Sequence, residues 1–192
     1  MSTQSKAYLT PEQYLEIERK AEWKSEYYRG EMTSMPHPRF AHVQVVSALV
    51  GELSDQVRNT DHEVLFSQMR VYAPRADFIT YPDLLVVPRH PQFLDRELDT
   101  VLNPTVIVEV LSESTDAYDR GRKFELYRAL DTLEEYVMIS SHRVRVERYT
   151  RLPDGAWNYG EKTDLSDTVE LKSLDCSLRL ADIYERVDFT KA

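Results

Sequence analysis

Apolar residues recur along the chain with two periods, and each period indicates a different kind of element. A spacing of three to four residues, typical of a helix with one buried face, follows a capping-box pattern made by Thr10, Pro11 and Gln13. The buried face expected for the second such segment carries four aliphatic residues: Val46, Leu49, Leu53 and Val57. This spacing predicts helices over residues 10–18, 42–57, 116–130 and 178–187.

Shorter runs of apolar and β-branched residues predict strands. Arg29 and Gly30 form the expected turn of an early hairpin, while Pro74 is expected to end one strand and Pro82 to begin the next. The run over residues 105–112 is nearly continuous in its apolar character, which indicates a central strand. Strands are predicted over residues 63–72, 81–87, 105–112, 134–140 and 143–150, with hairpin regions over 25–35 and 157–174 and a loop over 88–104.

The order of these elements predicts the fold class. A helix joins residues 105–112 to residues 134–140, so these two strands are expected to be parallel with a right-handed crossover. The three strands before that helix can pair antiparallel to one another. No linker rich in Pro, Gly or Ser divides the chain. We therefore expect one domain over residues 1–192, of the α/β (α+β) class, with a mixed central sheet flanked by helices.

Two of the predicted core strands each contain one acidic residue, Asp83 and Glu109. If these strands are adjacent and the acids lie directly opposite, their Cβ atoms are about 5 Å apart. Two carboxylates at that distance repel each other, and a hard divalent cation such as Mg²⁺ relieves the repulsion because it prefers oxygen ligands. The alternative is that Asp83 caps a turn and Glu109 pairs with an arginine.

The following helix adds a lysine at an unexpected place. At about 100° per residue, Lys123 lies in the middle of an apolar face that includes Leu126, Tyr127 and Leu130. A lysine packed against the sheet needs an anionic partner, and Glu109 lies on the strand that leads into this helix. Two alternatives remain: an ordinary helical ion pair of Lys123 with Asp119, or a lysine that extends to the surface.

Composition narrows the functional classes. The net charge is −9, which argues against a general nucleic-acid binder but leaves room for a local basic strip. The simpler interpretation of that strip is a solvated face. The one cysteine excludes an internal disulfide and a Cys-based zinc site, and no apolar run is long enough for a membrane span or a signal peptide, so we expect a cytoplasmic protein. The candidate basic strip comprises Arg120, Arg122, Lys123, Arg128, Arg143, Arg145, Arg148 and Arg151.

Several segments resemble one known family. The residues "PD" on one strand, "EVLS" on the next, "DRGRKFELY" on a helix and "EEYVMIS" on a further strand are similar to the Uma2-like (DUF820) restriction endonucleases, within the PD-(D/E)XK nuclease superfamily. The resemblance spans most of the chain and implies a restriction-endonuclease-like αβββαβ core over about residues 40–150. It departs from the superfamily motif at Leu111, where a lysine is expected. In this family the lysine corresponds to Lys123 on the helix.

The resemblance also implies a reaction and its residues. Asp83, Glu109 and the backbone carbonyl of Val110 would hold Mg²⁺ or Mn²⁺, while Lys123 would orient the attacking water and offset developing charge during hydrolysis of DNA. Four further candidates come from the surrounding segments. Glu26 and Glu31 resemble family positions that contribute a carboxylate, although on sequence grounds alone the simpler interpretation of each is an exposed hairpin acid. His42 is either a core or helix-start histidine or one that faces the acids. Gln68 and Arg70 could face substrate, and the simpler interpretation is a salt bridge or a surface position.

Three hypotheses therefore stay open. The first is a metal-dependent DNA endonuclease that acts as a homodimer, since cutting both strands favours two sites. The second is a catalytically silent nuclease fold that serves as a nucleic-acid or protein binding module, which Leu111 and the net charge of −9 allow. The third is a structural protein in which Asp83, Glu109 and Lys123 form a buried ion triad.

Overall fold

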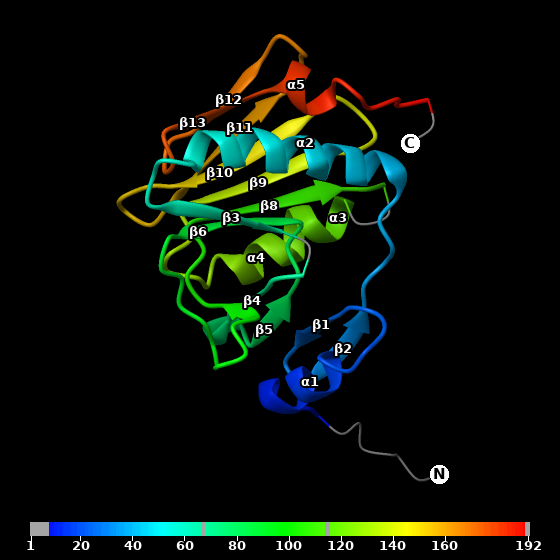
Figure 1. The fold of residues 1–192 in the computed structure, drawn as a ribbon, viewed down its shortest axis with the longest axis vertical. Helices are drawn as coiled ribbons and strands as arrows, with labels where there is room; N and C mark the ends of the chain where they lie inside the picture. Colours follow the sequence, from blue (N-terminus) through cyan, green and yellow to red (C-terminus); the bar gives the residue numbers. More distant parts are fainter. Residues whose placement is uncertain (1–7, 67, 114–115, 191–192) are drawn as a thin grey trace.

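The computed structural model describes residues 8–66, 68–113 and 116–190 (Figure 1). A six-stranded sheet forms the larger body of the molecule, and a smaller module carries the N-terminal helix and hairpin. Within the described residues, none of the helices combines the length and the apolar character that crossing a membrane requires. The helices are α1 (Pro11–Glu18), α2 (Phe40–Val57), α3 (Asp116–Tyr118), α4 (Phe124–Tyr127) and α5 (Leu180–Tyr184), with a 3₁₀ turn at Pro74–Ala76 and a π-helical turn at Asp119–Lys123.

The strands form three sheets in the described part of the chain. The large sheet has the order β11-β10-β9-β8-β6-β3, the second has the order β2-β1-β5-β4-β7, and β12 pairs with β13 alone. The strand bounds are β1 (Ser25–Tyr28), β2 (Glu31–Ser34), β3 (His62–Phe66), β4 (Arg70–Ala73), β5 (Phe78–Thr80), β6 (Leu84–Pro88), β7 (Thr100–Val101), β8 (Val106–Leu111), β9 (Glu135–Ser140), β10 (Val146–Arg151), β11 (Trp157–Lys162), β12 (Thr168–Leu171) and β13 (Cys176–Arg179).

Local chemistry explains the N-terminal module. The Thr10 hydroxyl accepts a hydrogen bond from the backbone N–H of Gln13, whose side chain accepts one from the N–H of Thr10, so the predicted capping box is present. The β1–β2 hairpin turns at Arg29 and Gly30, with φ values of 45° and 87°. Gly30 tolerates that left-handed conformation without strain, and a Cβ there would also collide with Tyr8.

The central sheet has the predicted topology. β3, β6 and β8 pair antiparallel in turn, and β8 pairs parallel to β9 after the helical crossover. The αβββαβ core consists of α2, β3, β6, β8, the crossover helices and β9, in that order. The strands β4, β5 and β7 belong to the separate second sheet. The predicted fold class and the parallel strand pair are therefore confirmed.

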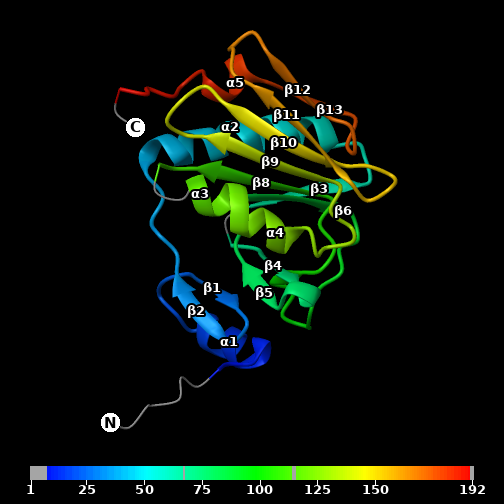
Figure 2. The same cartoon turned by 180° about the vertical axis from the view of Figure 1, so that it is seen from behind.

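Helices cover both faces of this sheet, as the two views in Figures 1 and 2 show. α2 and α5 pack on one face with Val108 and Val110 of β8, whereas α4 packs on the other face with Ile107 and Leu111. Because side chains alternate along a strand, Glu109 belongs to the face that α4 covers. The crossover helix and the acid thus meet inside the protein.

Some predicted elements are wrong in detail. The run over residues 63–72 is not one strand, because β3 joins the large sheet and β4 the second sheet. β5 was missed, and the short β7 lies in the predicted loop. The buried face of α2 is centred on Val45 rather than Val46, which is only partly buried. The terminal helix and the helix expected over 116–130 are shorter than predicted, and the latter contains the π turn.

Candidate functional site

Asp83 and Glu109 meet at the end of the β6–β8 pair. Leu84 of β6 lies opposite Val108 of β8, and one further step of this antiparallel register brings Asp83 opposite Glu109. The Asp83 Oδ2 atom accepts a hydrogen bond of 2.7 Å from the backbone N–H of Val110. Asp83 is partly exposed, whereas Glu109 is buried. The pair therefore has one carboxylate inside the core and one at its surface.

Two donors hold the same oxygen of Glu109. The Tyr127 hydroxyl donates to Oε1 at 2.6 Å, and the Lys123 ammonium lies 2.9 Å from that atom. Burial raises the pKa of Glu109 to about 8, with the charge of Lys123 opposing the shift and the charges of Asp83 and Asp119 adding to it. The site therefore holds more acidic groups than its buried cation neutralises, and a further cation would be favoured there.

Lys123 is buried between two acids rather than extended to the surface. Its Nζ atom lies 2.9 Å from Glu109 and 3.3 Å from Asp119, and 5% of the residue is exposed. Burial works to lower the pKa of Lys123, but the charges of Glu109 and Asp119 outweigh burial and raise it. Lys123 is therefore a fixed ammonium ion. The two pairings that the sequence left as alternatives, with Glu109 and with Asp119, occur together.

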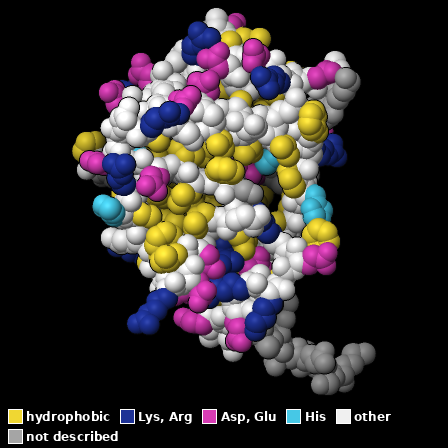
Figure 3. Space-filling model, viewed as in Figure 1, with side chains coloured by type: hydrophobic (Ala, Val, Ile, Leu, Met, Phe, Trp, Pro, Cys, Tyr) yellow, Lys and Arg dark blue, Asp and Glu magenta, His cyan; other side chains and the backbone are white. Residues whose placement is uncertain are grey.

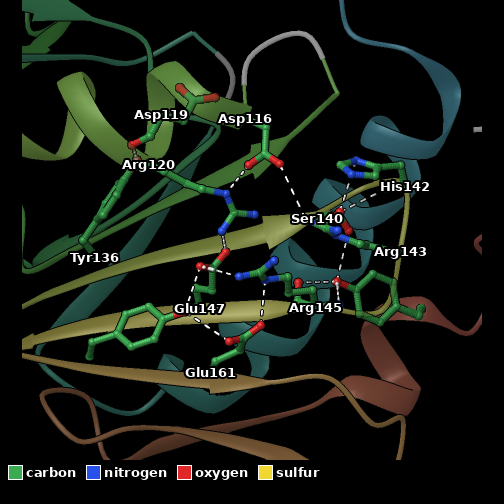
Figure 4. Close-up of polar contacts among 12 residues, drawn as sticks. Asp116, Asp119, Arg120, Tyr136, Ser140, His142, Arg143, Arg145, Glu147 and Glu161 are labelled. Atoms are coloured by element: carbon green, nitrogen blue, oxygen red, sulfur yellow. Dashed lines mark hydrogen bonds and ion pairs between the residues drawn. The ribbon is translucent and has the colours of Figure 1, made fainter.

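The π turn that carries Asp119 and Lys123 is fastened to the sheet (Figure 4). The Tyr136 hydroxyl on β9 donates to the backbone carbonyl of Asp119 at 3.1 Å. Arg120 pairs with Asp116 one turn before it and with the buried Glu147 on β10. Single π turns within helices are common at functional sites. These anchors set where Asp119 and Lys123 point, and no pattern in the sequence indicated the π turn itself.

His42 faces the acids, which is the less expected of its two interpretations. Its Nε2 atom lies 3.0 Å from the Oδ1 atom of Asp83, near the start of α2. Its Nδ1 atom is buried and has no hydrogen-bond partner among the described residues. Asp83 is therefore held by two elements, because His42 of α2 contacts one of its carboxylate oxygens and the N–H of Val110 on β8 contacts the other.

The N-terminal module contributes Glu26 and a lysine that the sequence did not single out. Glu26 accepts a hydrogen bond of 2.6 Å from the Tyr118 hydroxyl and one of 3.4 Å from Thr80. Lys24 lies two residues before Glu26, and its ammonium is 4.9 Å from the centre of the Tyr81 ring. Burial lowers the pKa of Lys24, while the charge of Asp83 opposes this. Side chains two residues apart in a strand lie on the same face, so the position of Lys24 two residues before Glu26 was the sequence signal that could have identified it.

The other sequence candidates lie at the surface or in separate ion pairs. Glu31 is exposed on β2, and Gln68 is exposed between β3 and β4. Arg70 is buried and pairs with Asp99, with its guanidinium donating to Tyr81 at 2.7 Å, so the salt-bridge interpretation applies to it. None of these three has a described contact with Asp83 or Glu109.

The donor set fits a hard divalent cation that also takes ligands from substrate and solvent. Within the described residues, no group of three or more His, Cys, Asp or Glu side chains could hold a metal ion. A closed structural metal site is thus not present there. Two carboxylates and a nearby backbone carbonyl are the partial set from which Mg²⁺ is commonly held, with waters and phosphate oxygens completing it.

The raised pKa of Glu109 predicts how stability depends on pH. The folded-state pKa of about 8 exceeds the ordinary value of 4.5, so the stabilising contribution is complete below pH 4.5 and is lost as the pH rises to about 8. A Glu109→Gln variant cannot ionise. We expect this variant to gain stability relative to the wild type from about pH 5 to pH 8 in urea unfolding measurements. Parallel stability curves would contradict the shift.

Comparisons with known proteins show the family and the fold of the chain. The family model Uma2, described as "Putative restriction endonuclease", matches residues 11–181. Two uncharacterized proteins of Synechocystis sp. are each 33% identical: sll1609 over 78% of this chain and 84% of its own, and slr1290 over 94% of both. A crystal structure titled as a putative nuclease belonging to DUF820, from Anabaena variabilis, shares the fold with a TM-score of 0.74 and 17% identity over 92% of this chain and 98% of that one.

Proposed function

The chain belongs to the Uma2 family, and on that premise we propose that it is a metal-dependent endonuclease that hydrolyses phosphodiester bonds in DNA. One observation carries the proposal: Asp83, directly before β6, accepts a hydrogen bond from the N–H of Val110, the residue after Glu109 on β8, and the buried ammonium of Lys123 lies 2.9 Å from Glu109. Two carboxylates can hold a divalent cation, and an ammonium group beside them can offset the charge that develops during phosphate hydrolysis.

Asp83 and Glu109, with the carbonyl of Val110, would hold Mg²⁺ or Mn²⁺. Bound there, the cation would polarise the phosphate and lower the pKa of a coordinated water. His42 supports the partly exposed carboxylate of Asp83, and Tyr127 fixes the orientation of Glu109. Partners of this kind, which hold a ligand in place, commonly change metal affinity 10- to 100-fold when removed.

Lys123 acts as an orienting and charge-stabilising group rather than as a base. Its two acidic partners keep it protonated, so it can donate hydrogen bonds but cannot accept a proton. Leu111, at the position where the superfamily has lysine, is fully buried among the residues that α4 covers. Lys123 approaches the same face of β8 from the crossover helix, which supports a lysine that has migrated in sequence while remaining near the second acid.

A cleavage assay tests the proposal. We expect Mn²⁺ or Mg²⁺ to support cleavage of plasmid and oligonucleotide DNA, and a chelator or Asp83→Asn to remove it. Asp154→Asn, at an exposed turn, is the matched control and should cleave like the wild type. Cleavage that survives both the chelator and Asp83→Asn would contradict the proposal, as would no cleavage of any substrate with a metal shown to bind.

The silent binding module remains the second candidate, favoured by the net charge of −9. That module would bind nucleic acid or a protein without cutting. The structural ion triad would bind neither metal nor DNA, which separates the two alternatives from each other.

We also propose a homodimer for the case of duplex cleavage, because cutting both strands favours two sites. The mass of the protein in solution, measured with and without DNA, tests this. A monomer that cuts only one strand would remove the need for a second copy.

A further inference from the structure

The arginines of the candidate basic strip are mostly engaged within the protein. Arg120 and Arg145 both pair with Glu147, and Arg148 lies 3.8 Å from Glu135. Arg151 donates to backbone carbonyls, including that of Leu130 at 2.7 Å. A protein that grips a long duplex usually does so through many phosphate contacts. Because these guanidinium groups are engaged within the protein, the candidate basic strip does not supply a surface with many phosphate contacts.

Exposed rings lie in the two segments that lead to the site. Trp23 is 60% exposed and Phe40 is 77% exposed, and the Trp23 ring meets the ring of His37 edge-on at 4.8 Å. The backbone N–H of Met35 donates to the carbonyl of Lys24 at 2.9 Å, which ties the two segments together. Figure 3 shows a small hollow below the position of α2 on the face that it draws.

These segments are continuous with the candidate site. Lys24 follows Trp23 directly, and its ammonium lies over the ring of Tyr81, two residues before Asp83. Phe40 begins α2, two residues before His42, which contacts Asp83 at 3.0 Å. Exposed aromatic rings and a cation are thus carried by the same short stretches of chain that reach the carboxylates.

We propose that this rim binds unpaired nucleotides, with a base stacked on Trp23, a second ring available at Phe40, and Lys24 at a backbone phosphate. The inference rests on the proposed function and specifies its substrate class as single-stranded or locally unpaired DNA. Bases stack on exposed aromatic side chains without regard to sequence, and each such contact contributes about 1–3 kcal/mol beside the contacts with the backbone phosphates. In a paired duplex the same base faces are already stacked within the helix.

The two tryptophans of the chain allow a direct test. A Trp157→Phe variant leaves Trp23 as the only tryptophan, so its emission reports stacking. The probes are an oligo-dT of about 15 nucleotides and the same strand annealed to oligo-dA, titrated in the presence of a chelator so that nothing is cleaved. We expect the single strand to quench the emission and to bind at least about tenfold more tightly than the duplex.

Variants and a control complete the experiment. In the otherwise wild-type protein, Trp23→Ala should weaken single-strand binding about tenfold, measured with a labelled oligonucleotide, and Trp23→Phe should restore most of it. Lys24→Gln should reduce the slope of log affinity against log salt by about 0.7. Leu165→Ala removes an exposed apolar side chain elsewhere and should change nothing.

Equal affinity for the duplex, no quenching, or unchanged binding by Trp23→Ala would each overturn the inference. The result is independent of hydrolysis because no metal is present. Single-strand binding without any metal-dependent cleavage would therefore refute the proposed reaction and leave the binding surface standing.

Discussion

Replacement of Glu109 by glutamine is expected to abolish measurable Mn²⁺ binding and to lower DNA cleavage at least about a hundredfold. Loss of a group that only orients a ligand commonly costs 10- to 100-fold, and loss of a ligand itself should cost more. Glutamine keeps the size of the side chain and its contact with Tyr127 but removes the negative charge that the cation requires. Isothermal titration of Mn²⁺ into both proteins measures the first effect, and a cleavage assay measures the second.

The control for this experiment is Glu63→Gln, which removes an exposed acid from the edge strand β3. It has the same change in net charge and should bind Mn²⁺ like the wild type. Because substrate phosphate can complete such a site, the titration is repeated with DNA present. If Glu109→Gln binds Mn²⁺ as tightly as the wild type in both titrations, the metal is not held at this strand pair.

Replacement of Lys123 by methionine is expected to destabilise the protein by about 3–5 kcal/mol, the cost of removing one partner from a buried ion pair. Methionine fills similar space, so the loss arises from Asp119, and above about pH 8 also from Glu109, which remain without their cation. Urea unfolding measures this change. The double variant Lys123→Met with Glu109→Gln should be more stable than the sum of the two single effects by about 1–3 kcal/mol.

A surface pair provides the comparison. Lys20 pairs with Glu16 at 3.4 Å, and both side chains are 74% exposed. Lys20→Met should change stability by less than about 1 kcal/mol, since solvent screens such pairs. If Lys123→Met has an equally small effect, the ion cluster contributes little to folding and its lysine is tolerated for another reason.

Local signals predicted much of the fold. The capping box at Thr10 and the turn at Gly30 are decided within a few residues, so the sequence specifies them directly. The parallel pairing of β8 and β9 follows from the helix between them. The meeting of Asp83, Glu109 and Lys123 followed from the same two kinds of reasoning, strand adjacency and helical period, although their roles stay predictions.

The sequence could not reveal which partner a strand would choose. The run over residues 63–72 contains no Gly or Pro that would end a strand, yet β3 and β4 belong to different sheets, because pairing depends on contacts far along the chain. The position of Lys24 beside Asp83 has the same origin. It depends on how the N-terminal module docks, through contacts such as that between Tyr118 and Glu26.

The number of residues in the π turn between β8 and β9 determines which side chains of this segment lie near Glu109. Asp119 and Lys123 lie within it, and Tyr127 follows one turn later, so all three reach the Glu109 side of the sheet only with the present number of residues. Each residue of a helix turns the chain by about 100°. Deleting Gly121, where an added Cβ would meet no other atom, would therefore change the angle between Asp119 and Lys123 around the helix axis. In this segment an insertion or deletion would alter the candidate site as directly as a substitution of Asp119 or Lys123, although Gly121 itself has no functional side chain.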